Sequence, residues 1–264
     1  MAFSLRAASV ADYPVYAGLF PELAVPDPVL TAADFGARMV PSMVVLDGEE
    51  RGIGYAYWQA YGATTHVVHV VVDSRARGRG AGAALLAEVR RRAVAARSTR
   101  WYLNLKQDNA AAVRLYERTG FAVEQEGWAL RTRWQDLAAL AGGADGVSAE
   151  TSDPADDTGV GARFDLAAER IAQLRARPGE VLVSLRRGGA VVAFAGFAPG
   201  FSGVFPVRVS SPDLARPLFD ALRPHATRDD LHVFVEGDRV LHDALRACGA
   251  TLEHATYRMS ADLL

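Results

Sequence analysis

Apolar and polar residues alternate in short segments through the first half of the chain, and helical repeats of apolar residues lie between them. Period-two alternation predicts half-buried strands, whereas apolar residues three and four apart predict amphipathic helices. Strands followed by strand, helix, strand and helix predict an α/β fold with a mixed sheet. The expected strands are residues 3–6, 42–46, 52–61, 65–72, 101–105, 121–124 and 127–134, and the expected helices are 10–20, 31–39, 81–97 and 109–119.

The second half of the chain repeats this order less regularly. Between the halves, residues 144–162 carry only acidic charges among Gly, Ser, Thr and Pro, and they show no helical or strand period. We therefore expect two domains of one fold, residues 1–140 and 162–264, joined by an acidic linker over 141–161. In the second domain helices are expected at 165–176, 212–222 and 238–247, and strands at 181–186, 190–197, 204–209, 231–235 and 252–259.

Charge and composition narrow the classes of partner. A net charge of −2 over 264 residues does not suit a general nucleic-acid binder, which needs a basic excess. No segment approaches the roughly 20 consecutive apolar residues that span a membrane, and the N-terminus lacks the pattern of a signal peptide. The single cysteine, Cys248, excludes an intramolecular disulfide and a cysteine-based metal site. We expect a cytoplasmic monomer or homodimer without a metal, a nucleic-acid partner or a membrane partner.

Three glycines, Gly78, Gly80 and Gly82, lie where the helix over 81–97 is expected to begin. Glycine there costs backbone entropy, which indicates a positive φ or a close approach to the backbone. Gly78, Gly80 and Ala83 match the dinucleotide-binding spacing, but the acidic residue required about 20 positions later is missing. A Walker-type loop is excluded because the only lysine, Lys106, lies far from the glycines. The pattern therefore predicts another kind of phosphate site, at the amides of a helix N-terminus.

Two motifs resemble those of the GNAT superfamily of N-acetyltransferases. The loop after the strand over 65–72 is similar to the acetyl-CoA loop of that family, Gln/Arg-x-x-Gly-x-Gly/Ala, with Arg77, Gly80 and Gly82 at the specified positions. Residues 109–121, NAAAVRLYERTGF, resemble the second CoA segment, Asn-x-x-Ala-x-x-Leu-Tyr-x-x-x-Gly-Phe, at every specified position. The motifs occur in the order of the family, and the resemblance covers roughly residues 1–135.

The resemblance implies two tandem GNAT-like domains, of which the first is an acetyl-CoA-dependent N-acetyltransferase. In the family the tyrosine of the second motif stands beside the sulfur of CoA, which implies that Tyr116 is the general acid for the departing thiolate. The alternative for Tyr116 is packing beneath the sheet. Asn109 is expected to cap the helix on which Tyr116 lies, and the amide of Val72 is expected to hold the oxyanion. The residues implied to contact acetyl-CoA are Val70, Val72, Arg77, Gly78, Arg79, Gly80, Ala81, Gly82, Ala83, Asn104, Asn109, Ala112 and Tyr116.

An amine acceptor must lose a proton before it attacks, because a free alkyl amine has a pKa near 10.4. Strand alternation places His66 on one face with Thr64, Val68, Val70 and Val72, and places His69 on the other. The position of His66 resembles that of the glutamate base in some family members, so His66 is the candidate base. The alternative is a hydrogen-bonded core histidine. Candidates for orienting a cationic acceptor, or else solvated loop charges, are Glu22, Asp27 and Asp34.

The acceptor is expected to be a small-molecule or peptide amine, and the sequence does not specify which. The alternative function is a noncatalytic acyl-CoA sensor. The second half is expected to be a degenerate GNAT-like domain, because it has no glycine between Gly203 and Gly237 where a cofactor loop would lie. Aligning Gly249 with Gly120 also replaces the motif residues Asn109, Tyr116 and Phe121 by Asp238, Leu245 and Ala250.

Overall fold

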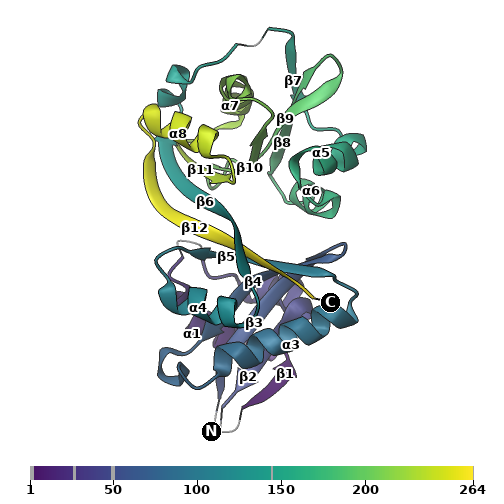
Figure 1. Cartoon of the computed structure of the whole chain (residues 1–264), viewed down its shortest axis with the longest axis vertical. Helices are drawn as coiled ribbons and strands as arrows, with labels where there is room; N and C mark the ends of the chain where they lie inside the picture. Colours follow the sequence, from purple (N-terminus) through teal and green to yellow (C-terminus); the bar gives the residue numbers. More distant parts are fainter. Residues whose placement is uncertain (1–2, 26–27, 49–50, 144, 264) are drawn as a thin grey trace. The chain divides into compact units, whose positions relative to one another are not determined.

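The computed structural model describes residues 3–25, 28–48, 51–143 and 145–263, and the chain divides into two compact units. Unit 1 comprises Met1–Glu124 together with Arg258–Leu264, and unit 2 comprises Gln125–Tyr257. The division falls inside two long strands, β6 (Ala122–Arg133) and β12 (Thr251–Asp262), which therefore contribute to both units (Figure 1). Within the described ranges, no helix is long and apolar enough to cross a membrane.

Unit 1 is built on a mixed sheet. Neighbouring strands from β1 to β4 are antiparallel, whereas β4 and β5 are parallel because the chain returns through helix α3 (Ala81–Ala95). The strand order across the sheet is β1 (Ser4–Ala7), β2 (Met43–Asp47), β3 (Gly52–Tyr61), β4 (Thr64–Val72), β5 (Arg100–Lys106) and β12.

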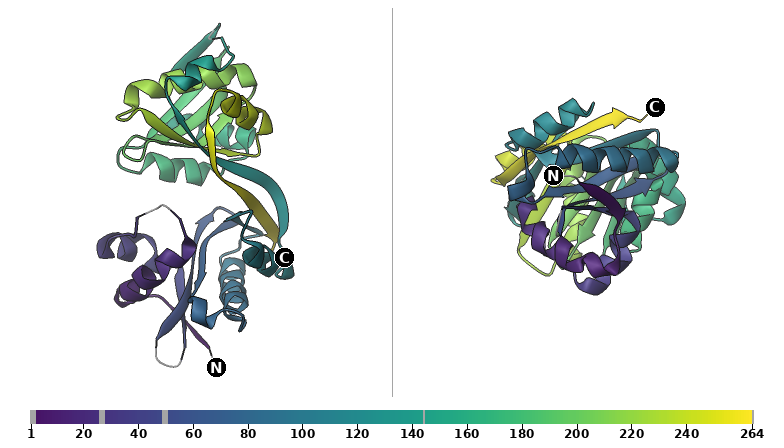
Figure 2. Two further views of the ribbon diagram at one scale, coloured as in Figure 1. Left: turned by 90° about the vertical axis from the view of Figure 1, so that its left-hand side faces the viewer. Right: turned by 90° about the horizontal axis from the view of Figure 1, so that it is seen from below.

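Helices cover both faces of this sheet. Two neighbouring residues of β3 point to opposite faces: the ring of Tyr55 lies 5.8 Å from that of Tyr16 in α1 (Tyr13–Leu19), whereas a Cβ on Gly54 would contact Leu85 of α3. Helix α2 (Ala32–Arg38) packs with α1, and α4 (Ala110–Arg118) packs with α3 at Gly82. Figure 2 (left view) shows the purple helices α1 and α2 and the blue helix α3 on opposite sides of the sheet.

The end of the last strand of the chain belongs to unit 1. The amide of Leu263 donates to the carbonyl of Thr99 at 2.8 Å, and Met259 and Leu263 are buried, with 0% and 2% of their surface exposed. The sequence-based boundaries are corrected accordingly. The first segment of unit 1 ends at Glu124 rather than at residue 140, and unit 1 also includes residues 258–264, which were expected in the second domain. Strand pairing between distant segments has no local sequence signal, so the hydrophobic pattern could not show this exchange.

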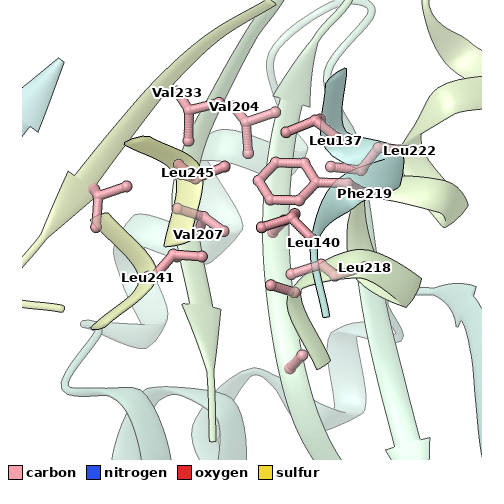
Figure 3. Packing of buried hydrophobic residues seen from close by; sticks show 14 of the residues in the cluster. Leu137, Leu140, Val204, Val207, Leu218, Phe219, Leu222, Val233, Leu241 and Leu245 are labelled. Carbon is pink, nitrogen blue, oxygen red and sulfur yellow. The ribbon is translucent and has the colours of Figure 1, made fainter. Parts of the chain in front are cut away.

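Unit 2 repeats the architecture, with a parallel pair formed by β10 (Gly203–Val209) and β11 (Asp230–Glu236). Its strand order is β12, β6, β11, β10, β9 (Ala190–Ala198), β8 (Val181–Arg187) and β7 (Val147–Thr151), and its helices are α5 (Asp157–Phe164), α6 (Ala168–Arg175), α7 (Ala215–Leu222) and α8 (Arg239–Ala247). Phe219 of α7, Val207 of β10 and Leu245 of α8 meet in its core (Figure 3).

The segment expected to be an acidic linker is structured. It contains β7, which pairs antiparallel with β8, and most of α5, in which Val160 is 1% exposed. Three of its five acidic residues form ion pairs with arginines of unit 2: Glu150 and Asp156 with Arg186, and Asp157 with Arg175. The acidic composition therefore reflects charge pairing rather than solvation, and the linker prediction is replaced by a strand and a helix.

The two strands expected at 121–124 and 127–134 are the single strand β6. Gly127, within this strand, is required by close packing: a Cβ there would lie 2.6 Å from Oγ1 of Thr256 and 2.8 Å from the ring of Phe234. A glycine inside a strand can thus mark a close neighbour rather than a turn.

Candidate active site

The loop between β4 and α3 presents the start of a helix. Gly78 and Gly80 have φ of 76° and 85°, and Gly80 is the N-cap of α3. The first helical amide to donate backwards is that of Ala84, which donates to the carbonyl of Gly80 at 3.0 Å. The amides of Ala81, Gly82 and Ala83 precede it and have no carbonyl four residues before them within the helix. These three amides and the helix dipole therefore favour the binding of an anion at this end of α3.

The glycines of this loop are needed for different reasons. A Cβ on Gly80 would meet no atom within 4 Å, so its positive φ is what calls for glycine. A Cβ on Gly82 would lie 2.9 Å from Cδ2 of Leu115, so Gly82 permits the close packing of α3 on α4. The space beside Gly80 is open to a ligand, whereas the space beside Gly82 is filled by the protein.

Arg77 ties this loop to the segment that follows α1. Its Nε donates to the carbonyl of Val72 at 3.1 Å, and its Nη2 lies 2.7 Å from Oε2 of Glu22. Glu22 is therefore an ion-pair partner of the loop rather than a solvated charge. Of the other acidic candidates, Asp34 accepts from Oγ1 of Thr31 at 2.7 Å, and Asp27 lies outside the described residues. Arg79 is exposed at the loop surface.

Strands β4 and β5 part next to this loop. Their parallel pairing runs from Thr64–Arg100 to Val67–Leu103, and both strands continue beyond it. The amide of Asp73 donates to Ile53 of β3, so the alternate amides of Val72 and Val70 point to the β5 side. Beyond the last paired residues, these amides thus point into the space between the two strands, in the part of β4 that runs toward the loop before α3.

Asn104 supplies an acceptor at the same opening. It follows Leu103, the last paired residue of β5, and its Oδ1 is buried without a hydrogen-bond partner in the described part of the chain. Buried polar atoms are normally satisfied, so this oxygen is suited to an N–H donor of a ligand. The predicted cofactor residues Val70, Val72 and Asn104 are brought together here with the glycine loop.

A β-bulge in β4 changes the faces expected for its histidines. Tyr57 pairs with His69, but the next residue, Trp58, pairs with Val67, so Val68 is an extra residue in β4. His66 pairs with Gln59, which shares a face with Tyr57. His66 and His69 therefore lie on the same face, and the expectation that they point apart is wrong. The bulge also moves Val70 and Val72 to the opposite face, because one extra residue reverses the alternation.

The two histidines have different surroundings on that face. The ring of His66 stacks on Tyr102 of β5, with centroids 4.4 Å apart and planes at 4°. The ring of His69 is enclosed by Phe20, Tyr55 and Tyr57, with centroids 5.7–6.0 Å away. Burial among these rings lowers the pKa of His69 to about 4. His69 is consequently neutral at neutral pH, and His66 remains the candidate for proton exchange.

Lowering the pH from 7.5 to 5 is expected to remove about 2 kcal/mol of unfolding free energy through His69 alone. Its folded-state pKa of about 4 lies below the ordinary value of 6.5, so the unfolded chain binds more protons between these values. The contribution is fully present above the unfolded-state pKa and is lost as the pH falls toward the folded-state pKa. Denaturant unfolding of the wild type and of His69→Gln at both pH values checks this, and equal losses in the two proteins would contradict it.

Tyr116 lies on α4, whose N-terminus is capped as predicted: Oδ1 of Asn109 accepts from the amide of Ala112 at 3.1 Å. Tyr116 is 8% exposed, and its ring packs edge-to-face with that of Phe121, with centroids 5.7 Å apart. Burial raises the pKa of Tyr116 to about 12, so the phenol stays protonated at neutral pH. Packing and proton donation are therefore compatible roles for this residue.

At the corresponding strands of unit 2, a buried ion pair occupies the place of the opening. β10 and β11 pair in parallel at Gly203–His232 and Val204–Val233. Further along the same strands, Arg208 and Glu236 form an ion pair at 2.8 Å, and their side chains are 13% and 1% exposed. Arg208 and Glu236 thus join the two strands where β4 and β5 separate in unit 1.

Helix α8 of unit 2 has an N-terminal cap like that of α4, but it lacks the tyrosine that α4 carries. Asp238 caps α8 by accepting from the amide of Leu241 at 2.9 Å, as Asn109 caps α4. Leu245, at the position aligned with Tyr116, is fully buried and has no proton to donate. In the described residues of both units, no group of three His, Cys, Asp or Glu side chains is placed to hold a metal ion.

Two residues were absent from the sequence prediction: Tyr102, which stacks on His66, and Arg258, which contacts Tyr102. Tyr102 could have been found from its place on the strand parallel to that of His66. Arg258, whose Cζ lies 4.0 Å from the ring centroid of Tyr102, carries no local signal because β12 is distant in sequence from both strands.

Comparison with known proteins gives one family match and several similar structures. Residues 13–121 match the sequence model of the Acetyltransferase (GNAT) family, and no curated protein gives a significant match to the chain. A GCN5-related N-acetyltransferase from Sphaerobacter thermophilus is 18% identical, with a TM-score of 0.65 over 99% of this chain and 96% of its own. A tandem GNAT protein from the clavulanic acid biosynthesis pathway is 15% identical, with a TM-score of 0.62 over 100% and 99%. A GCN5-related N-acetyltransferase from Anabaena variabilis is 12% identical, with a TM-score of 0.64 over 100% and 73%.

These likenesses confirm the predicted fold class, two GNAT-like domains in tandem, each with a mixed sheet flanked by helices. The residues that match the family model, 13–121, all lie within unit 1.

Proposed function

We propose that unit 1 is an acetyl-CoA-dependent N-acetyltransferase that moves an acetyl group directly to a primary amine of a small molecule or peptide. The observation that carries the proposal is the opening between β4 and β5, which leads to the uncapped start of α3. Around it lie outward strand amides, the unsatisfied Oδ1 of Asn104 and a helix N-terminus. These groups fit an extended ligand that has amides along its length and a pyrophosphate, as acetyl-CoA has.

The proposed reaction needs three proton transfers, and two side chains of unit 1, those of His66 and Tyr116, can carry them out. Acetyl-CoA supplies an activated thioester carbonyl. His66 accepts a proton from the amine, directly or through a water, and the free amine forms the new C–N bond. The amide of Val72 donates to the carbonyl oxygen as negative charge develops there. Tyr116 donates its proton to the sulfur when the C–S bond breaks, and the extra proton on the new amide nitrogen returns to the Tyr116 phenolate, directly or through a water, so the neutral amide and a free thiol leave.

The second unit supports placing the reaction in unit 1. Its two parallel strands are joined by Arg208 and Glu236, and the residue aligned with Tyr116 is a leucine. A ligand entering there would have to separate a buried ion pair, which is costly when either partner is left unpaired. We propose that unit 2 is a degenerate GNAT-like domain without turnover of its own.

A panel of amines tests the proposed function. The full chain is incubated with acetyl-CoA and each amine in turn, and free thiol is measured against a reaction without amine. Amine-dependent thiol release that yields the acetylated amine supports the proposal. Calorimetric binding of acetyl-CoA without release for any amino acid, polyamine, aminoglycoside or peptide N-terminus would contradict it.

Replacing Gly80 with leucine is expected to lower acetyl-CoA affinity at least about 100-fold, because the side chain fills the open space beside the helix start. Gly249→Leu is the matched control: its φ of 92° is similar and its Cβ also meets open space, but it lies in unit 2. Both variants should lose stability, and only Gly80→Leu should lose affinity in calorimetry. Equal affinities of the two variants would exclude the loop as the pyrophosphate site.

A further inference from the structure

Three side chains stack across three neighbouring strands of unit 1. The imidazole of His66 on β4 lies parallel to the ring of Tyr102 on β5, with centroids 4.4 Å apart. The guanidinium carbon of Arg258 on β12 lies 4.0 Å from the same ring centroid. Because β4 and β12 flank β5 on opposite sides, His66 and Arg258 contact opposite faces of Tyr102.

The fold holds each member of this stack in place. His66 and Tyr102 are register partners in the parallel pair, next to the last paired residues. Tyr102 is 3% exposed, and the side chain of Arg258 is 13% exposed. Nε of Arg258 lies 3.7 Å from Oε2 of Glu124, whose Oε1 lies 2.8 Å from Nη2 of Arg100. A carboxylate thus lies near the guanidinium that covers the aromatic ring, at a distance longer than a hydrogen bond.

An imidazole can take a proton only if a ring nitrogen faces the donor. The χ2 torsion of histidine is broad, so the ring of a partly exposed histidine on a strand otherwise samples many orientations. Parallel stacking on a buried ring restricts that rotation. A cation on the far face of the ring is attracted to the π-electrons and helps to hold the ring on which the imidazole stacks.

We propose that Tyr102 and Arg258 are positioning residues that hold the His66 imidazole in the orientation required for proton transfer from the acceptor amine. This rests on the proposed function, in which His66 is the base. It also gives β12, the last strand of the chain, a role in the reaction. Arg258 lies on this strand and belongs to unit 1, although it follows every residue of unit 2 in the sequence.

Variants of Tyr102 test the role in the full chain, with kcat and KM measured for an amine that the panel identifies. Tyr102→Phe keeps the stacked ring and should keep kcat within about twofold. Tyr102→Leu removes the flat surface and should lower kcat roughly tenfold, a part of the 10²- to 10⁴-fold contribution of a general base. The KM for acetyl-CoA should not change in either variant.

The decisive measurement repeats Tyr102→Leu in a His66→Ala background. If Tyr102 acts through His66, the substitution should change kcat less than about twofold there, because the group that it positions is gone. A tenfold loss in both backgrounds would overturn the positioning role and would show that Tyr102 acts through the fold. Arg258→Met keeps the aliphatic length and serves as the second variant if Tyr102→Leu does not fold: about a threefold loss of kcat that disappears in the His66→Ala background is expected.

The failure of this inference is distinguishable from the failure of the proposed function. Full kcat in His66→Ala would exclude His66 as the base and overturn the positioning role with it, while acetyl transfer itself stands. A loss of kcat in His66→Ala together with full kcat in Tyr102→Leu and Arg258→Met would overturn the positioning role alone.

Discussion

Replacing Tyr116 with phenylalanine is expected to lower kcat by about 10²- to 10⁴-fold, the range of a general acid, and to leave acetyl-CoA affinity near that of the wild type. The ring that packs against Phe121 is kept, and only the proton donor is removed. Steady-state kinetics and calorimetry on the two proteins measure the two effects separately. Because burial raises the pKa of Tyr116 to about 12, ionisation of this phenol should not lower kcat of the wild type below about pH 10.

A second Tyr→Phe substitution controls for the loss of a hydroxyl as such. Tyr257 lies in unit 2, and along β12 it points to the face opposite Arg258. Tyr257→Phe should therefore retain kcat within about twofold. Equal kcat in Tyr116→Phe and the wild type would remove Tyr116 from the mechanism and leave its packing against Phe121 as its role.

Removing residues 258–264 is expected to unfold unit 1 and abolish acetyl-CoA binding. The truncation deletes the strand that pairs with β5, together with the buried side chains Met259 and Leu263. Each of these side chains is worth about 1.5–3 kcal/mol of burial, and the lost strand pairing adds to that. Their sum is a large part of the roughly 5–15 kcal/mol that stabilises an ordinary domain. Thermal unfolding and calorimetry of the truncated chain measure the loss.

The same argument applies to residues 1–145 expressed alone, which lack this strand and should be insoluble or unable to bind acetyl-CoA. Within the full chain, Met259→Ala should cost about 2–5 kcal/mol, whereas Asp262→Ala on the exposed side of β12 should cost less than about 0.5 kcal/mol. A soluble 1–145 fragment with the acetyl-CoA affinity of the full chain would show that the exchanged strand is dispensable.

Elements that carry local patterns were predicted closely. β3 has the expected bounds, and α3 begins at Ala81 as expected, two residues shorter than predicted at its end. The Asn109 cap was predictable because it joins residues three apart in sequence. The linker prediction for the acidic segment was wrong because carboxylates of this segment form ion pairs with Arg175 and Arg186. Composition alone cannot distinguish paired carboxylates from solvated ones.

The sequence by itself determined the glycine loop at the start of α3, the capped helix that carries Tyr116 and the repeated order of elements, because each depends on neighbours within one or two turns or strands. The tertiary structure alone decided that His66 and His69 share a face, since a one-residue bulge at Val68 reverses an alternation that the sequence shows as regular. It also decided that Arg258 stands beside Tyr102. Pairing between β5 and β12 joins residues more than a hundred positions apart, and only the balance of packing over the whole sheet selects it.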